Sequence, residues 1–144
     1  IADLHIVAGP LPGGDVPPAL VPLAIDEFPA LLVAAAVAKG TTRITGAAEL
    51  RVKESDRIAA MARGLEAVGV QVEEAEDGIT VHGGGVRGGV VDSLGDHRIA
   101  MSFAALGAVA ADGIEIRDVA NVQTSFPGFI DAMSGLGLNI EQLP

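Results

Sequence analysis

An internal duplication limits the folds open to this chain more than any other feature of its sequence. In each copy an aspartate precedes an apolar stretch, a glycine ends that stretch, and a short strand-like segment follows. Two such similar segments in one chain indicate repeated supersecondary units. Neither unit could bury its own core without the other. We expect two units that each run helix, strand, helix and then strand or hairpin. The matching positions are Asp26 and Asp96, Gly40 and Gly113, and residues 68–73 and 136–141.

The first copy contains two predicted helices. Residues 30–38 are apolar on nearly every side, which predicts a buried helix with Asp26 as its N-cap and Pro29 in its first turn. Residues 41–45 alternate like a short strand. After a loop, the spacing of apolar residues over 55–68 predicts an amphipathic helix.

Glycine and proline mark the turns. Asp77-Gly78 separates two alternating segments and favours the positive φ values of a primed turn, which predicts a hairpin of residues 70–73 and 79–82. Residues 83–89 are rich in glycine but lack the lysine and spacing of a P-loop, so we interpret them as a connector. Residues 9–22 are too dense in proline and glycine for regular structure and predict a surface loop.

The second copy predicts a similar series. Asp96 would cap an apolar helix that runs to Gly113, and residues 114–116 would form the next strand. Phe and aliphatic residues at helical spacing predict a helix that follows Ser125, and residues 136–141 alternate like a final strand.

Length and composition predict a soluble globular domain that belongs to a longer protein. The 144 residues are 49% apolar, which is enough to bury a core, and no apolar run is long enough to span a bilayer. We expect a cytoplasmic protein. The chain opens at Ile1 directly on a strand-like segment, residues 3–7, which indicates a piece of something longer.

Charge and cysteine content exclude several functions. The formal net charge is −10, with no Trp or Tyr, whereas nucleic-acid binding favours a basic face with aromatic platforms. The chain has no cysteine, so disulfides, thiolate metal sites and a cysteine nucleophile are excluded within it. Chemistry here must use oxygen and nitrogen groups.

The few cations are unevenly placed. Arg51, Lys53 and Arg57 share one short segment, and Arg98 follows Asp96-His97 in another. One interpretation is local charge pairing on helices. The other is an anion site, because helix N-termini offer free N–H groups and a favourable dipole. If the duplicated helix starts converge, these cations would meet Asp26 and Glu54, and the cluster could hold a charged ligand and move protons beside it.

Four blocks give this cluster a family resemblance. In order and spacing they are similar to the signature blocks of the 5-enolpyruvylshikimate-3-phosphate synthase family, over a region from about Asp3 to Glu141. The Val-Lys-Glu-Ser-Asp-Arg string is the most specific, because Asp-His-Arg follows about forty residues later. The blocks are residues 25–31, 50–57, 96–101 and 124–127.

The resemblance implies an α/β (α+β) fold. In that family each of two domains has three repeats of a β-α-β-α-β-β unit, arranged as a β-prism, or inside-out α/β barrel. This chain would supply a partial domain: the tail of one repeat (1–24), a second repeat (25–90) and a third (91–144). The N-terminal domain would be missing, and the fragment alone would be inactive.

The resemblance also implies a reaction and its residues. The family transfers the enolpyruvyl group of phosphoenolpyruvate to shikimate 3-phosphate. Both substrates are small molecules, and the resemblance implies no cofactor, no metal, no membrane and no nucleic acid. Asp26 would accept a proton and contact shikimate 3-phosphate together with Lys53, and Glu54 would donate a proton. Arg57 and Arg98 would bind phosphoenolpyruvate, because their planar forks suit carboxylate and phosphate oxygens. His97 would lie beside that site.

Two residues depart from the pattern of the family. Thr124 lies in the segment where many members carry a lysine, and Glu49 stands where many have an asparagine. Both changes resemble the branch that includes glyphosate-tolerant bacterial enzymes.

Three alternative functions remain. The first is the related transferase that acts on UDP-N-acetylglucosamine, but that enzyme lacks the Val-Lys-Glu-Ser-Asp-Arg string. The second is a non-catalytic folded module. The third is an RNA-terminal cyclase with a related repeat, which the acidic charge of this chain disfavours.

Overall fold

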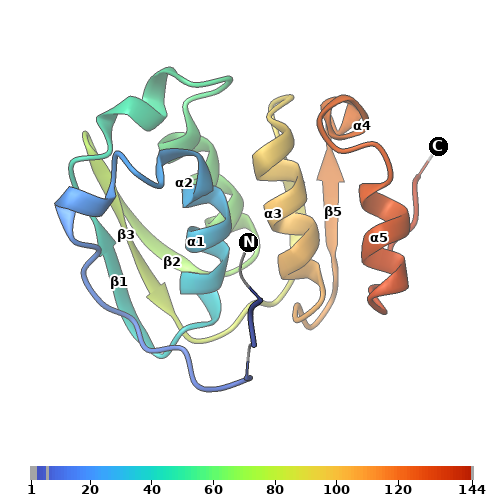
Figure 1. Ribbon diagram of the computed structural model, residues 1–144, viewed down its shortest axis with the longest axis horizontal. Helices are drawn as coiled ribbons and strands as arrows, with labels where there is room; N and C mark the ends of the chain where they lie inside the picture. Colours follow the sequence, from blue (N-terminus) through green and yellow to red (C-terminus); the bar gives the residue numbers. More distant parts are fainter. Residues whose placement is uncertain (1–2, 6, 144) are drawn as a thin grey trace.

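Strands and helices are mixed in this protein, as the expected α/β class requires (Figure 1). A computed structural model describes residues 3–5 and 7–143. An antiparallel three-stranded sheet has the order β1-β3-β2, and a separate parallel pair consists of β4 and β5. The strands are β1 (Gly40–Ile44), β2 (Gln71–Ala75), β3 (Gly78–Gly83), β4 (Gly89–Asp92) and β5 (Ile114–Arg117).

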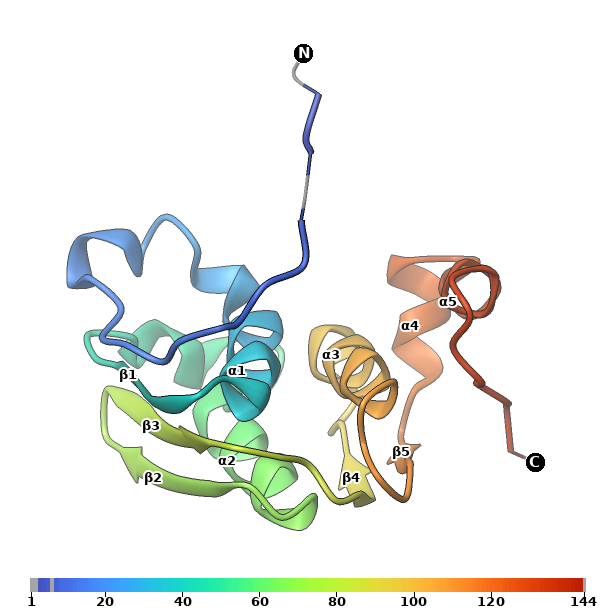
Figure 2. The same cartoon turned by 90° about the horizontal axis from the view of Figure 1, so that it is seen from below.

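Three helices, α1, α2 and α3, form the centre of the molecule (Figure 1). Helices α1 and α2 lie between the three-stranded sheet and α3, and α4 and α5 lie beyond α3 (Figures 1 and 2). They are α1 (Phe28–Val37), α2 (Arg57–Ala67), α3 (His97–Gly107), α4 (Ala120–Ser125) and α5 (Phe129–Gly135), with 3-10 turns η1 (Pro18–Leu20), η2 (Ile25–Glu27) and η3 (Ala48–Val52). Within the described residues, no helix is long and apolar enough to cross a membrane.

An apolar core joins α1, α2 and α3 to the three-stranded sheet. Phe28 and Leu32 of α1, Ile58 and Met61 of α2, and Phe103 of α3 are at most 1% exposed. Helix α2 can approach α3 closely because Gly64 has no side chain: a Cβ there would overlap the Phe103 ring. The starts of α2 and α3 lie at the same end of the molecule (Figure 1).

The turn of the predicted hairpin differs from the expectation. Strands β2 and β3 do pair antiparallel, but Ala75 faces Gly78, so the turn residues are Glu76 and Asp77. Neither has a positive φ, and the primed-turn prediction at Asp77-Gly78 is wrong. Gly78 is needed for another reason, because a Cβ there would strike the backbone oxygen of Ile44 on the neighbouring strand β1.

The loop over residues 9–22 is more ordered than its composition predicts. It contains η1, and it runs beside β1 through bridges between Pro12 and Lys39 and between Asp15 and Arg43. The glycine-rich connector over 83–89 is found as predicted, between β3 and β4, with Gly83 and Gly89 themselves forming the strand ends.

Two predicted strands are absent from the described residues. Residues 3–5 and 7 are exposed and extend away from the helices, and Ile6 lies outside the described residues (Figure 2). Residues 136–141 alternate in sequence but have no neighbouring strand to pair with. Alternation alone does not make a strand, because the backbone groups of a strand need a ladder partner.

Two predicted helices have different bounds. The helix capped by Asp96 ends at Gly107 rather than Gly113, because the chain turns so that Ala111 and Asp112 donate to the carbonyl groups of Val86 and Arg87. The helix expected after Ser125 begins only at Phe129, and a helix that the sequence did not predict, α4, precedes it. Ser125 ends α4, and Gly128, with a φ of 97°, separates it from α5.

Candidate active site

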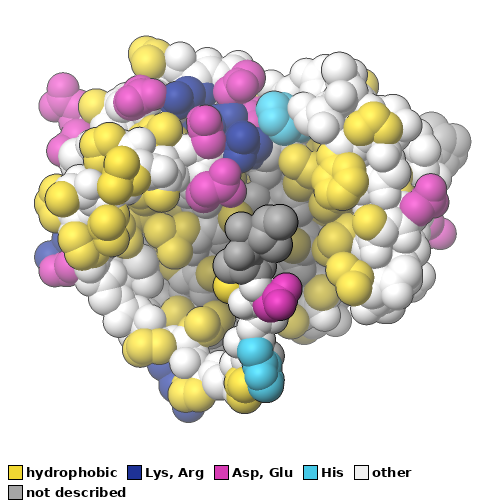
Figure 3. Space-filling view, viewed as in Figure 1, with side chains coloured by type: hydrophobic (Ala, Val, Ile, Leu, Met, Phe, Trp, Pro, Cys, Tyr) yellow, Lys and Arg dark blue, Asp and Glu magenta, His cyan; other side chains and the backbone are white. Residues whose placement is uncertain are grey.

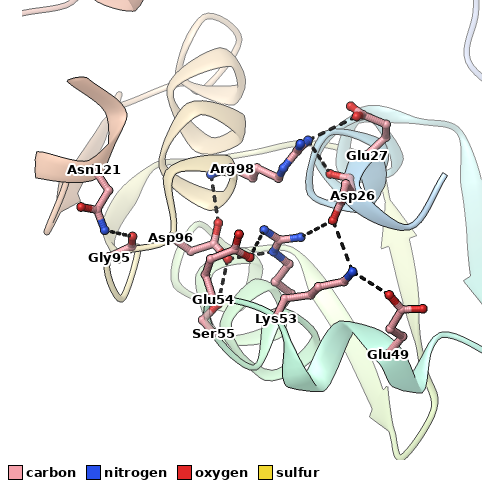
Figure 4. Close-up of polar contacts among 11 residues, drawn as sticks. Asp26, Glu27, Glu49, Lys53, Glu54, Ser55, Gly95, Asp96, Arg98 and Asn121 are labelled. Carbon is pink, nitrogen blue, oxygen red and sulfur yellow. Dashed lines mark hydrogen bonds and ion pairs between the residues drawn. The ribbon is translucent and has the colours of Figure 1, made fainter. Parts of the chain in front are cut away.

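The starts of α1, α2 and α3 meet at one end of the molecule and bring charged side chains together (Figure 4). Asp26 lies in η2 just before α1, Lys53 and Glu54 lie between η3 and α2, and Arg57 is the first residue of α2. Arg98 is the second residue of α3. All five residues predicted for catalysis and substrate binding therefore belong to one cluster. Figure 3 shows basic side chains gathered among acidic ones on this face.

Arg57 is the centre of this cluster. Its side chain is only 1% exposed, yet it makes ion pairs with three carboxylates. Nη1 lies 3.0 Å from Asp26, Nη2 lies 2.6 Å from Glu54, and Nε lies 2.8 Å from Asp96. Burial alone would lower the pKa of Arg57, but the Asp96 hydrogen bond and the surrounding negative charge raise it. The guanidinium is thus a permanent cation with its fork directed at Asp26 and Glu54.

Asp96 is the buried partner of Arg57. Its side chain is 0% exposed, and it caps α3 by accepting from the backbone N–H of Arg98. Ser55 donates to the same carboxylate at 3.1 Å. Burial would raise the pKa of Asp96, but the hydrogen bonds and the charge of Arg57 lower it below the ordinary value. The carboxylate is therefore ionised at neutral pH.

Asp26 does not have the structural role that the sequence predicts. The N-cap position of α1 is Glu27, and the turn of η2 leaves the Asp26 side chain free to face Arg57. Its side chain is 48% exposed and also lies 3.6 Å from Lys53. The Arg57 hydrogen bond is the main cause of a lowered pKa at Asp26, and the charges of Lys53 and Arg98 lower it further.

The rim of the cluster consists of more exposed ion pairs. Lys53 contacts Glu49 at 2.6 Å, and this hydrogen bond raises the pKa of Lys53. Arg98 donates to the backbone oxygen of Asp26 at 2.9 Å and to the Glu27 carboxylate at 3.2 Å. Each of the cations predicted to bind substrate is therefore held by a side-chain carboxylate, and an anionic ligand would compete with these carboxylates.

The remaining predicted positions lie beside the cluster or away from it. His97 is the half-buried first residue of α3, between Asp96 and Arg98. Thr124 is exposed on α4. Helix α4 is tied to the start of α3, because Asn121 donates to the backbone oxygen of Gly95 (Figure 4). Among the residues that the structure describes, no group of His, Asp and Glu is arranged to hold a metal ion.

Sequence reasoning missed what Asp96 does besides capping. The pattern predicts a helix cap, and one carboxylate oxygen does cap α3, but the other binds Arg57 across 39 positions of the chain. The available signal was that Asp96 lies in one of the four resemblance blocks. Nothing in the spacing alone indicates that its partner is Arg57.

A hollow near the C-terminal end of the described chain does not coincide with the charged cluster. It encloses about 1190 Å³ beside β5, α4 and the extended residues 138–143. None of the five predicted catalytic and binding residues lines it. We assign the site to the charged cluster because three cations and several carboxylates converge there at the starts of three helices.

Comparisons with known proteins agree with the sequence resemblance. The profile of the family described as EPSP synthase (3-phosphoshikimate 1-carboxyvinyltransferase) matches residues 3–133. The 3-phosphoshikimate 1-carboxyvinyltransferases of Xanthomonas axonopodis pv. citri and Xanthomonas euvesicatoria pv. vesicatoria are 57% and 58% identical over 141 residues. These alignments cover 98% of this chain but 32% of each relative, so the chain spans about a third of their length.

Solved structures give the same result. An EPSP synthase structure from Acinetobacter baumannii matches with a TM-score of 0.89 and 49% identity, over 92% of this chain and 32% of that one. A second structure from the same organism matches with a TM-score of 0.88 and 45% identity, over 94% and 32%. The α/β fold expected from the resemblance is confirmed as part of the EPSP synthase fold. This chain belongs to the EPSP synthase (3-phosphoshikimate 1-carboxyvinyltransferase) family.

Proposed function

We propose that the protein containing this chain transfers the enolpyruvyl group of phosphoenolpyruvate to the 5-hydroxyl of shikimate 3-phosphate. The products are 5-enolpyruvylshikimate 3-phosphate and phosphate, in the biosynthesis of chorismate and aromatic amino acids. The observation that carries this proposal is the Arg57 guanidinium, which is directed at both Asp26 and Glu54 in a chain of this family. A cation for a phosphate or carboxylate therefore lies between two groups able to exchange protons.

The proposed chemistry has two steps. In the first, the substrate hydroxyl oxygen bonds to C2 of phosphoenolpyruvate, Asp26 takes the hydroxyl proton, and Glu54 gives a proton to C3. In the second, the C2–O bond to phosphate breaks and C3 returns its proton to Glu54, which restores the enol double bond, while Asp26 gives the hydroxyl proton to the departing phosphate. Arg57, Arg98 and Lys53 would stabilise the negative charge of both substrates throughout.

Substrate binding would also make Asp26 a stronger base. In the free protein Arg57 is the main reason that the pKa of Asp26 is low, and a carboxylate with a lowered pKa is a weak base. A phosphoryl or carboxylate group that takes over Arg57 would weaken this hydrogen bond. The pKa of Asp26 would then rise, and its basicity would increase when the substrate hydroxyl is present.

The complete site requires more than this chain. We propose that an N-terminal domain covers the cluster from the other side, since the relatives are about three times as long. We further propose that residues 25–90 and 91–144 are two repeats, that residues 1–24 end another, and that the protein is cytoplasmic. The isolated chain would then expose bound ligand to water and would not catalyse the reaction.

A phosphate-release assay tests the proposal. The full-length protein is incubated with phosphoenolpyruvate and either shikimate 3-phosphate or UDP-N-acetylglucosamine. We expect release of inorganic phosphate and formation of an enolpyruvyl ether only with shikimate 3-phosphate. Release only with the UDP-sugar would favour the related transferase, and no release with either acceptor would contradict an enolpyruvyl transferase.

A further inference from the structure

We infer that Asp96 is a positioning residue for substrate binding, which acts through Arg57 and does not itself touch substrate. This inference rests on the proposed function, and it concerns a residue that the resemblance does not include among the catalytic or binding groups. The geometry points to it because the Asp96 carboxylate holds the back of the Arg57 guanidinium, while the front faces Asp26 and Glu54.

The two oxygens of Asp96 have different partners. Oδ1 accepts from the backbone N–H of Arg98 at 3.0 Å, at the start of α3. Oδ2 accepts from Nε of Arg57 at 2.8 Å and from the Ser55 hydroxyl at 3.1 Å, both at the start of α2. One carboxylate therefore fixes the helix starts that carry Arg57 and Arg98, the two arginines proposed to bind phosphoenolpyruvate.

The bond to Nε determines how the guanidinium can be used. A planar guanidinium held at Nε cannot turn freely, so Nη1 and Nη2 keep one orientation. In this orientation they contact Asp26 and Glu54, whose side chains are 48% and 53% exposed, at the open side of the cluster. An anionic ligand that replaces these two carboxylates would meet a preformed fork, and preorganisation of this kind strengthens binding.

Stability alone does not explain the pair. The Arg57 and Asp96 side chains are 1% and 0% exposed, so both charges have been removed from water. Buried ion pairs are a weak source of stability, because desolvation offsets most of the attraction. Capping α3 requires only one oxygen, and Oδ1 supplies it. The second oxygen, Oδ2, is not needed for the cap and instead orients the Arg57 guanidinium.

The chain contains a matched control. Asp56 caps α2 through Oδ1, which accepts from the N–H of Ala59, and its Oδ2 lies 2.8 Å from Nη1 of Arg51. Asp56 therefore also combines a helix cap with an arginine pair. Arg51, however, also contacts Glu74 and the backbone oxygens of Ala75 and Glu76 on the β2 side, away from Asp26.

The test compares Asp96→Asn with Asp56→Asn in the full-length protein. Asn caps helices about as well as Asp, so both variants keep the cap and lose the charge. We measure the thermal midpoint, the dissociation constants of phosphoenolpyruvate and inorganic phosphate by calorimetry, and kcat and KM. We expect Asp96→Asn to weaken binding of both anions by roughly 10–100-fold, the usual span for a charge-assisted hydrogen bond, and Asp56→Asn to change it less than about threefold.

If the two variants bind both anions equally well and their thermal midpoints fall by similar amounts, the inference is overturned and Asp96 is only a helix cap. If Asp96→Asn does not fold, Asp96→Glu is compared with Asp56→Glu, since each keeps the charge but displaces it. Wild-type binding by Asp96→Glu would overturn the inference as well. Lack of turnover in the wild-type protein contradicts the proposed function instead, and inorganic phosphate binding still tests the role of Asp96.

Discussion

The Arg57 guanidinium lies 3.0 Å from the Asp26 carboxylate, so the proposed anion-binding residue holds the proposed base in the free protein. The same guanidinium lies 2.6 Å from Glu54, the proposed acid. In the proposed reaction, substrate binding and proton transfer would therefore be linked through one side chain, and changes at Arg57 should affect both.

Replacement of Arg57 by lysine tests this link. Arg57→Lys keeps a positive charge but loses the planar fork, so we expect phosphoenolpyruvate binding in the full-length protein to weaken by roughly 10–100-fold. Isothermal calorimetry gives the dissociation constant. Arg51→Lys is the matched control, because Arg51 also pairs with two carboxylates but outside the cluster. Equal effects of the two substitutions would mean that the fork of Arg57 is not used for binding.

The isolated chain should fold without catalysing the reaction. Its apolar core is shared by α1, α2, α3 and the three-stranded sheet, which supports independent folding. The charged cluster has exposed carboxylates at its open side and would leave bound phosphate in water. Circular dichroism and cooperative urea unfolding would show the fold, and phosphate release would report turnover. Measurable turnover by the purified chain would contradict the need for a second domain.

Acid should destabilise the fold through Asp96. Its pKa is lowered from the ordinary 3.8, so the unfolded state binds protons more readily than the folded state. This contribution to the free energy of unfolding is complete above the ordinary pKa and is lost as pH falls below it. Urea unfolding between pH 6 and about pH 3 would measure the loss. We expect a shallower pH dependence in Asp96→Asn, and an unchanged dependence would contradict the assignment.

The contact between α2 and α3 depends on Gly64. A Cβ there would overlap the Phe103 ring, so Gly64→Ala should lower the free energy of unfolding by about 1–3 kcal/mol. The control is Gly107→Ala in α3, where a Cβ meets nothing within 4 Å and alanine is the better helix former. Urea unfolding compares the two. Equal stability of the variants would contradict the close packing.

Local patterns predicted the helices and the site segments better than they predicted the strands. Helix α2 was found close to its predicted bounds because the amphipathic spacing over 55–68 is regular and Gly69, with a positive φ, follows its end. Residues 136–141 show the limit of such patterns, since their alternation predicts a strand that has no partner in the described structure. Pairing is a property of the whole fold and is not contained in one segment.

At the site, too, the sequence predicted one part of the arrangement and not the other. The charges at three helix starts predicted convergence, and the structure brings Asp26, Lys53, Glu54, Arg57 and Arg98 together. The exact pairs could not be predicted. Asp26 was expected to cap α1 but binds Arg57, and Asp96 was expected only to cap α3 but also holds Arg57. Both outcomes depend on the distances between helix starts, which result from the packing of the whole fold.

Turnover by Glu54→Gln in the full-length protein tests the central claim most directly. If Glu54 donates the proton to C3 of phosphoenolpyruvate, substrate binding should be largely retained while the rate falls on the order of 10²–10⁴-fold. Glu66→Gln is the control, because Glu66 is an exposed glutamate near the far end of α2 and should leave the rate unchanged. A Glu54→Gln rate close to that of the wild-type protein would contradict the assignment of Glu54 as the acid.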